Sequence, residues 1–386
     1  MSNPIPYSCQ DISEADIAAV ADVLRAPFLT QGPAVPKFEE EFAALHGMQH
    51  GVAVANATGA LHIACLALGA GPSTRVWTTP NSFVASANCA RYCGATVDFV
   101  DIDPATRNMS VEKLADKLAL AATDDSLPGI LIPVDFAGYP CDMREMRELA
   151  DRYGFRIISD SSHAVGASYH GEPVGHYAHI SVFSFHPVKI ITTGEGGMCL
   201  TDDADLAATM RKARSHGITR DPAEMDQEPH GPWYYEQVGL GFNYRLTDIQ
   251  AALGSSQLTR IAERAARREM LARRYDDALA DLPLCLPPRS NDRNSAHHLY
   301  VVEIDGDRTR KSRGEVFDHL RKDGISPNVH YIPIHLQPDY RRLGFGAGDF
   351  PDSERYYGRA LSIPLFPTMT EEQQDRVIAS LTRALT

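Results

Sequence analysis

Lys189 is the residue whose type and setting most favour covalent chemistry. It follows a strand-like apolar run that begins at Ile180, and a turn rich in Thr and Gly follows it up to Gly197. Because burial beside Phe183 and Phe185 would remove water from an ammonium group, we expect the pKa of Lys189 to fall and its neutral amine to become accessible. Such an amine can form a Schiff base with a carbonyl compound or with pyridoxal phosphate. Taken alone, a lysine in this position is more often a surface residue on an exposed turn, and only its neighbours favour the chemical role. The other six lysines lie in polar, helix-like stretches (Lys37, Lys113, Lys117, Lys212, Lys311 and Lys322).

Two further polar side chains follow a second strand-like run, residues 155–159. Asp160 comes directly after the run, and His163 lies three residues further on. Ligands of open α/β sheets bind beyond the carboxyl ends of the strands, so a carboxylate here is well placed to face a pyridine nitrogen and keep it protonated. His163 could bind a cofactor oxygen. The alternatives are an N-cap or turn role for Asp160 and a structural role for His163.

Three other positions could complete a cofactor site. Thr58 and Gly59 lie where a short strand gives way to an apolar helix, and free backbone N–H groups at such a helix start favour a phosphate. Phe83 follows a strand and could stack on an aromatic ring, while Ser184 could add a hydroxyl to a phosphate. Thr58 as an N-cap and Phe83 as a core residue are the alternatives. Only the combination of these residues with Lys189 indicates a pyridoxal phosphate enzyme.

The elements that must hold these residues alternate between strand and helix, which predicts an α/β fold with a large, mostly parallel sheet. A long helical stretch, residues 247–279, would bridge to a smaller C-terminal α+β domain. We therefore expect a large domain over residues 1–255 and a small domain over residues 256–386. The predicted strands cover residues 51–55, 75–78, 96–100, 129–134, 155–159, 179–185, 197–201 and 301–304; the predicted helices cover residues 13–25, 35–46, 58–68, 82–92, 111–121, 143–153, 313–323 and 371–385.

Composition excludes several classes of protein. At 386 residues the chain exceeds the usual size of one core, and its net charge of −13 argues against general nucleic-acid binding. Seven scattered cysteines without paired spacing predict reduced thiols and no metal site. The N-terminus lacks the pattern of a signal peptide, and no apolar run reaches the roughly 20 residues of a membrane span. These features predict a cytoplasmic protein.

The chain resembles the sugar-nucleotide aminotransferases of the DegT/DnrJ/EryC1/StrS family along nearly its whole length. The segments around Asp160 and Lys189 are most similar to those of members that act in pseudaminic-acid biosynthesis. The resemblance implies the aspartate aminotransferase-like fold (fold type I), pyridoxal 5′-phosphate as cofactor, and L-glutamate and a UDP-linked keto sugar as substrates. The motifs that carry it lie at residues 29–32, 56–60, 79–88, 159–166, 184–197, 215–217, 241–254 and 329–334.

The resemblance also implies a role for each matching residue. Lys189 would be the Schiff-base lysine and proton shuttle, Asp160 would pair with the pyridinium nitrogen, and His163 would lie beside the phenolic oxygen of the ring. Phe83 would stack on the ring. Asn243 would reach the phosphate from a second subunit, which implies a homodimer with shared active sites. The phosphate would also be held by Ala57, Thr58, Gly59 and Ser184, and the sugar nucleotide would contact Tyr7, Pro27, Phe28, Leu29, Thr30, His330, Tyr331 and Tyr340.

The sequence departs from the family pattern at several points, and these leave the substrate open. Pro27 and Phe28 replace more polar residues of some relatives, Ile190 stands where proline is common, and residues 219–233 have no clear counterpart. A C4 aminotransferase for another sugar nucleotide, such as a UDP-4-keto-pentose or the bacillosamine precursor, is the nearest alternative. A sugar dehydratase of the same fold would replace the Schiff-base lysine by histidine, so Lys189 counts against that lyase. A silent binding protein would not need Lys189, Asp160 and His163 together.

Overall fold

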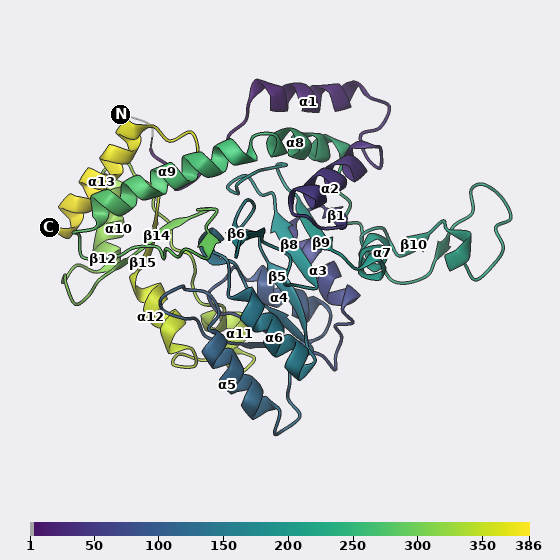
Figure 1. Cartoon of the computed structure of the whole chain (residues 1–386), viewed down its shortest axis with the longest axis horizontal. Helices are drawn as coiled ribbons and strands as arrows, with labels where there is room; N and C mark the ends of the chain where they lie inside the picture. The colour runs from purple at the N-terminus through teal and green to yellow at the C-terminus, as the bar shows by residue number, and fades with distance from the viewer. Residues whose placement is uncertain (1–3) are drawn as a thin grey trace.

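A seven-stranded sheet forms the centre of the larger part of the molecule (Figure 1). The computed structural model describes residues 4–386. Neighbouring strands are parallel from β3 through β2, β4 and β5 to β8, whereas β9 is antiparallel to β8 and to β1. This confirms the predicted, mostly parallel α/β sheet. In spatial order the strands are β1 (His50–Val54), β9 (Gly197–Thr201), β8 (Ile180–Ser184), β5 (Arg156–Asp160), β4 (Ile130–Ile132), β2 (Arg75–Thr78) and β3 (Thr96–Phe99).

Helices cover both faces of the sheet because its strands alternate their side chains between two cores. In β8, Ile180 and Val182 pack into one core, whereas Phe183, together with Phe185 just beyond the strand, packs into the other. The first core is covered by α3 (Ala57–Ala67), α4 (Ala85–Tyr92) and α7 (Ala204–Ala213). The opposite face is covered by α2 (Ala34–Leu45), α8 (Asp248–Leu258), α5 (Val111–Ala121) and α6 (Met143–Tyr153).

A separate apolar core lies in the C-terminal part, and the start of the chain joins it. Ile5 is 1% exposed within this core, where its backbone N–H donates to the carbonyl of Gly324 at 2.9 Å and its carbonyl accepts from Ser326 at 2.8 Å. Both ends of the described chain therefore lie in the same part of the molecule (Figure 1). The core is built on β12 (Leu284–Cys285), β14 (Tyr300–Ile304) and β15 (Ala360–Ile363), with α9 (Ile261–Leu279), α10 (Arg313–Lys322) and α13 (Glu371–Leu385).

The domain boundary expected between residues 255 and 256 falls inside α8 (Asp248–Leu258). Packing crosses it in both directions, since Ile5 joins the C-terminal core and Ala296 packs with the apolar cluster around Phe183. The division into two domains at residue 255 stays a prediction.

The remaining helices are α1 (Glu14–Arg25), α11 (Pro338–Arg341) and α12 (Pro351–Arg359), with short 3-10 turns at Phe136–Gly138, Pro222–Glu224 and Ile334–Leu336. Three further short strands are β6 (Ser168–Tyr169), β7 (Glu172–Pro173) and β13 (Arg293–Asn294).

The segment 219–233 belongs to an arm that projects from the body (Figure 1). The arm begins at β10 (Ile218–Thr219), which pairs with β11 (Glu236–Gln237), and it exposes 67% of Trp233. Within residues 4–386, no helix is long and apolar enough to cross a membrane.

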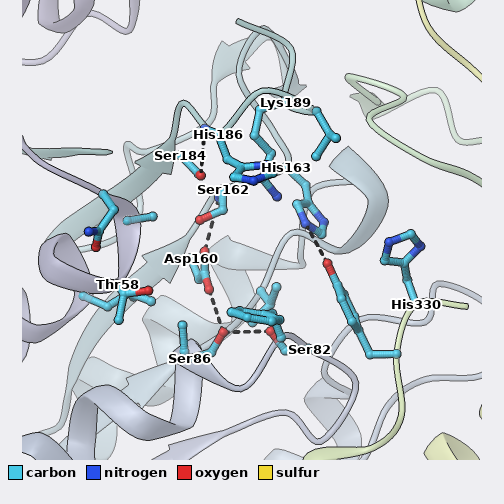
Figure 2. A pocket seen from close by; sticks show the side chains of 18 of the residues that line it. Thr58, Ser82, Ser86, Asp160, Ser162, His163, Ser184, His186, Lys189 and His330 are labelled. Carbon is cyan, nitrogen blue, oxygen red and sulfur yellow. Dashed lines mark hydrogen bonds between the residues drawn. The ribbon is translucent and has the colours of Figure 1, made fainter. Parts of the chain in front are cut away.

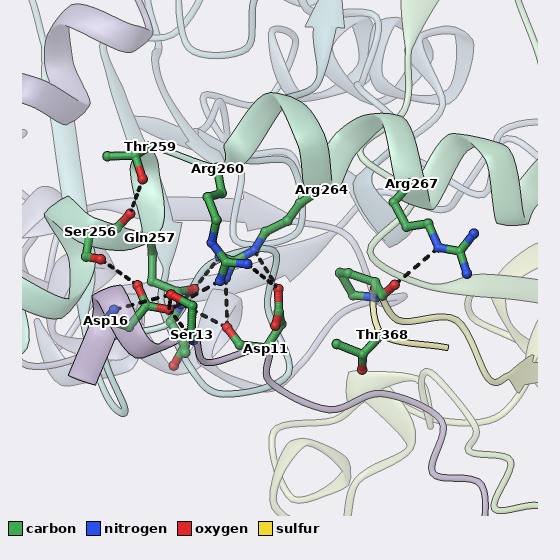
Figure 3. A network of polar contacts seen from close by, with 12 residues as sticks. Asp11, Ser13, Asp16, Ser256, Gln257, Thr259, Arg260, Arg264, Arg267 and Thr368 are labelled. Atoms are coloured by element: carbon green, nitrogen blue, oxygen red, sulfur yellow. Dashed lines mark hydrogen bonds and ion pairs between the residues drawn. The ribbon is translucent and has the colours of Figure 1, made fainter. Parts of the chain in front are cut away.

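The helix expected over residues 247–279 is two helices, which corrects the prediction. The chain turns at Thr259 and Arg260, where the Thr259 hydroxyl donates to the carbonyl of Ser256 at 2.7 Å and Arg260 leaves helical geometry (φ −112°, ψ 14°). The turn directs Arg260 toward the acidic residues of the N-terminal segment (Figure 3). Neither Thr259 nor Arg260 is a Gly or Pro, so the hydrophobic pattern alone predicts one continuous helix.

Asp16 is the centre of this network, and its replacement by Ala is expected to destabilise the protein by about 3 kcal/mol or more. The residue is fully buried and accepts hydrogen bonds from Ser256 Oγ at 2.6 Å, Gln257 Nε2 at 2.7 Å and Arg260 Nη2 at 3.2 Å. It also forms a capping box with Ser13 at the start of α1. Removing the carboxylate leaves these donors and the Arg260 charge without their acceptor. Urea denaturation of the purified variant measures the loss.

Asp22→Ala on the same helix is the matched control. Its ion pair with Arg25 is more than three-quarters exposed on both sides, so its loss should change the free energy of unfolding by no more than about 0.5 kcal/mol. Equal denaturation midpoints for the two variants would show that the buried network does not hold α1 to α8.

Candidate active site

A cavity of about 1020 Å³ opens at the carboxyl ends of β5 and β8. It collects residues that lie far apart in the sequence, from the start of α3, the loop before α4, the lysine turn and the segment 328–331. Figure 2 shows how their side chains converge. Among the predicted site residues, the cavity is lined by Tyr7, Ala57, Thr58, Gly59, Phe83, Asp160, His163, Ser184, Lys189, His330 and Tyr331.

Lys189 lies on the turn between the antiparallel strands β8 and β9, as the sequence predicts. Its backbone N–H donates to the carbonyl of His186 at 2.9 Å, and Ser8 Oγ donates to the carbonyl of Val188 at 3.1 Å, so the turn is anchored from both sides. Burial lowers the pKa of Lys189 from 10.5 to about 8, although nearby Asp160 opposes this shift. About a fifth of the amine is therefore neutral at about pH 7.4, far more than in a free lysine.

The lowered pKa of Lys189 predicts how the cofactor-free enzyme captures an aldehyde. Below about pH 8 the amine is protonated and cannot attack, so the capture rate should rise about tenfold per pH unit up to about pH 8 and then level off. Stopped-flow absorbance of the stripped enzyme mixed with pyridoxal phosphate measures this rate. Free Nα-acetyl-lysine is the control, and its capture rate should rise up to about pH 10.4. An enzyme profile that parallels the control would contradict the shift.

Asp160 ends β5 and points into the cavity, where it is 5% exposed (Figure 2). Its Oδ2 accepts a hydrogen bond from Ser86 Oγ at 2.6 Å, and its Oδ1 accepts from the backbone N–H of Ser162 at 3.2 Å. Within residues 4–386, no ion pair involves this carboxylate. It therefore offers a negative charge to a cationic group in the cavity.

His163 lies in the cavity as a neutral donor. Burial, together with Lys189 and His330, holds the pKa of its imidazole well below 6.5. The backbone N–H of Ala137 donates to Nδ1 at 3.2 Å, so the single ring proton belongs on Nε2. Nε2 lies 3.2 Å from the hydroxyl of Tyr331. His163 can thus donate a hydrogen bond to an oxygen inside the cavity.

The start of α3 forms an anion-binding end of the cavity. Asn56 is the N-cap, because its Oδ1 accepts from the Gly59 N–H at 2.8 Å; the alternative of Thr58 as N-cap is thereby corrected. Ala57 and Thr58 keep N–H groups without intrahelical acceptors. A methyl group on Gly59 would lie 3.2 Å from a ring carbon of Tyr244, so the glycine keeps this entrance open. Such a helix start favours a phosphate.

Another side of the cavity is an aromatic wall formed by Phe83, His330 and Tyr331. Phe83 is 58% exposed, and its ring centre lies 6.3 Å from that of Tyr331. This corrects the alternative of Phe83 as a core residue. Burial and nearby Lys189 lower the pKa of His330 to about 3. The centre of the His330 ring lies 5.4 Å from that of the Tyr7 ring. These aromatic faces can hold a flat ring and a sugar.

Six predicted residues do not line the cavity of their own chain. The structure corrects the expectation that Tyr340 contacts the substrate. Tyr340 is 2% exposed, donates its hydroxyl to Asn88 Oδ1 at 2.7 Å and packs on Phe99, so it is a core residue. The other five, Pro27, Phe28, Leu29, Thr30 and Asn243, are exposed on the surface outside this cavity.

Several cavity residues are absent from the predictions. Ser86 lies within the family motif at residues 79–88, which is the only sequence signal for it. The others are Asn56, Leu61, Ser82, Ala85, Tyr92, Val134, Ser162, His186, Val188, Glu195, Tyr244, Asn328 and Val329. Across residues 4–386, no cluster of three or more His, Cys, Asp or Glu side chains could hold a metal ion.

The residues in the cavity fit pyridoxal phosphate. The partly desolvated amine of Lys189 can bind the aldehyde, the buried carboxylate of Asp160 can hold a proton on the ring nitrogen, and the start of α3 can hold the phosphate. The fit rests on the open entrance at Gly59 and on the buried Asp160, which forms no ion pair within residues 4–386. When bound, this cofactor supplies an electron sink for the carbon next to the amine.

Comparison with known proteins agrees with this fit. The DegT/DnrJ/EryC1/StrS aminotransferase family matches residues 10–382. The spore coat polysaccharide biosynthesis protein SpsC of Bacillus subtilis is 37% identical over 98% of this chain and 96% of its own length. PseC of Helicobacter pylori, an aminotransferase involved in the biosynthesis of pseudaminic acid, has a structure that matches with a TM-score of 0.91, 30% identity and 99% coverage of both chains. The putative sugar aminotransferase Spr1654 of Streptococcus pneumoniae, solved in its PMP form, matches with a TM-score of 0.89, 29% identity and 98% coverage of both chains. The chain therefore belongs to the DegT/DnrJ/EryC1/StrS aminotransferase family, and it is a pyridoxal phosphate-dependent sugar aminotransferase of fold type I.

Proposed function

We propose that this enzyme transfers the amino group of L-glutamate to the C4 keto group of a UDP-linked 4-keto-6-deoxy-N-acetyl sugar. This is the reaction of UDP-4-amino-4,6-dideoxy-N-acetyl-β-L-altrosamine transaminase in pseudaminic acid biosynthesis. The observation that carries the proposal is the structural match to PseC over 99% of both chains, together with a cavity in this chain that is large enough for a cofactor and a sugar nucleotide.

In this proposal each residue of the chain acts on a stated atom. Lys189 Nζ would remove the proton from Cα of glutamate and, with the cofactor bound, would return a proton at C4′; it would act in the reverse direction on the sugar. Asp160 holds the proton on the ring nitrogen, and His163 Nε2 donates to the phenolic oxygen. Thr58 and Ser184 bind the phosphate. Phe83, Tyr7 and Tyr331 exclude water from the reacting atoms.

A panel of UDP-linked 4-keto sugars tests the substrate. The enzyme is converted to its pyridoxamine phosphate form with L-glutamate, and return of the pyridoxal phosphate absorbance is followed with each sugar. The 4-keto-6-deoxy-N-acetyl sugar should react at least about tenfold faster than a 4-keto-pentose, and NMR of the product should show the C4 configuration of the altrosamine series. Equal rates across the panel would favour an aminotransferase for another sugar nucleotide, a class that the similarity to SpsC also supports.

We further propose that the enzyme is a cytoplasmic homodimer with shared active sites. Pro27, Phe28, Leu29, Thr30 and Asn243 are exposed outside their own cavity, which suits residues that serve the cavity of a second copy. In support of a reducing compartment, the seven cysteines are all free thiols.

Mixing two inactive variants tests the shared site. A Lys189→Ala subunit paired with an Asn243→Ala subunit forms one site with both defects and one intact site. Random exchange should therefore restore about a quarter of the wild-type sites. Activity no higher than that of the two variants measured separately would contradict sharing.

A further inference from the structure

Ser86 makes the only side-chain hydrogen bond to Asp160 among residues 4–386. The serine lies in the first turn of α4, is 1% exposed, and reaches across to the end of β5 at 2.6 Å. Serines inside helices usually bond to a carbonyl of their own helix, but this hydroxyl donates to a carboxylate on a different element. The second donor to Asp160 is the backbone N–H of Ser162, which any substitution of that serine other than proline leaves in place.

A second serine supports the first. Ser82 Oγ lies 2.7 Å from Ser86 Oγ and is 3% exposed. An ionised carboxylate can only accept, so Ser86 uses its single proton on Asp160, and Ser82 must then donate to Ser86. The order of donation is therefore fixed from Ser82 through Ser86 to Asp160 (Figure 2).

The loop that carries Ser82 is itself anchored. Asn81 Nδ2 donates to the carbonyl of Arg107 at 3.1 Å, and the backbone N–H of Ile334 donates to the carbonyl of Pro80 at 2.9 Å. Phe83, whose ring lies in the cavity, directly follows Ser82. The two serines thus join the aromatic wall to the carboxylate at the strand end.

We propose that Ser86, supported by Ser82, is a positioning residue that fixes the carboxylate plane of Asp160 toward the ring nitrogen of pyridoxal phosphate. A charge-assisted hydrogen bond favours the ionised form of its acceptor and restricts its rotation. The inference rests on the proposed pairing of Asp160 with the ring nitrogen. It adds to the site a hydroxyl that acts through Asp160.

Ser86→Ala and Ser86→Thr test the inference through cofactor affinity. Fluorescence titration of the stripped full-length enzyme gives the Kd of pyridoxal phosphate. Ser86→Ala should weaken binding about tenfold, whereas Ser86→Thr, which keeps the hydroxyl, should restore the wild-type Kd to within about threefold. Ser82→Ala should have a smaller effect in the same direction.

A cofactor without the ring nitrogen separates positioning from packing. The analogue 1-deaza-pyridoxal phosphate replaces that nitrogen by carbon, so Asp160 has no ring proton to hold. The loss caused by Ser86→Ala should therefore disappear with the analogue, whereas a general distortion of the cavity would weaken both cofactors equally.

Ser380→Ala is the matched control. Ser380 is also 1% exposed and donates to an aspartate, with Oγ 2.7 Å from Asp323 Oδ2, but it lies on α13 in the C-terminal core. It should lower the thermal midpoint without changing either Kd.

Three results would overturn the inference: an unchanged Kd in Ser86→Ala, an equal loss with both cofactors, or a similar loss in Ser380→Ala. Borohydride reduction keeps these results distinct from a failure of the proposed function. If the wild-type enzyme cannot be labelled by pyridoxal phosphate at Lys189, the proposed site itself is wrong. If it is labelled while Ser86→Ala binds normally, only the positioning role is wrong.

Discussion

Lys189→Ala is expected to reduce turnover by about 10⁴-fold or more and to abolish covalent attachment of the cofactor. The residue carries two functions, since the same amine binds the aldehyde and moves the proton, and loss of a general acid–base group alone costs up to about 10⁴-fold. Lys189→Arg should be equally inactive, because a guanidinium remains protonated and cannot attack. Coupled detection of 2-oxoglutarate measures turnover, and mass spectrometry after borohydride reduction measures attachment.

Two observations complete this test. Added methylamine should restore part of the half-reaction with glutamate in Lys189→Ala, because a free amine can replace the missing base. Lys311→Ala, at an exposed lysine on a loop before α10, should keep wild-type turnover. Appreciable turnover in Lys189→Ala without added amine would refute the assignment of Lys189.

Asp160→Asn is expected to lower kcat by about 10² to 10³-fold. The neutral amide cannot hold the proton on the ring nitrogen, and loss of one partner from a buried charge pair costs about 3–5 kcal/mol, where each 1.36 kcal/mol is a factor of ten in rate. Because Lys189 is intact, the variant should still be labelled by pyridoxal phosphate and borohydride. Single-turnover kinetics with L-glutamate isolate the proton-transfer half-reaction.

Asp323→Asn is the control for Asp160→Asn, because this carboxylate also accepts from a serine but is half-buried in the C-terminal part of the chain, between Ser380 and Arg383. It should leave the single-turnover rate unchanged. A rate in Asp160→Asn within about threefold of wild type would mean that the ring nitrogen does not need this carboxylate.

The strands and helices of the sheet domain could be predicted closely because local signals agree there. The predicted helix at residues 143–153 and the strands at 75–78 and 197–201 match the structure at both ends. Gly154, in a left-handed conformation (φ 80°), ends the first of these, as glycine commonly does after a helix. In such segments the periodicity and the terminating residue indicate the same boundary.

Site residues could be predicted from the sequence only where the residue type and its place after a strand indicate a chemical role. Lys189 and Asp160 each end or follow an apolar strand, so their positions follow from the topology. Ser86 carries no such signal, because its bond to Asp160 joins residues 74 positions apart and depends on how α4 packs. The family resemblance predicts Tyr340 at the substrate although no motif contains it, yet its ring packs beside Phe99, and only the three-dimensional packing distinguishes these outcomes.

Ile5, which pairs with the C-terminal part of the chain, has a consequence for how the protein folds during synthesis. Its partners, Gly324 and Ser326, leave the ribosome long after it does, whereas all strands of the main sheet precede residue 202. The sheet can therefore assemble before the partners of Ile5 in the C-terminal part have been synthesised. Closing so long a loop is entropically costly and slows folding. Completion of the C-terminal core should thus be the last step, and nascent chains stopped before residue 324 should expose the segment around Ile5 to chaperones and proteases.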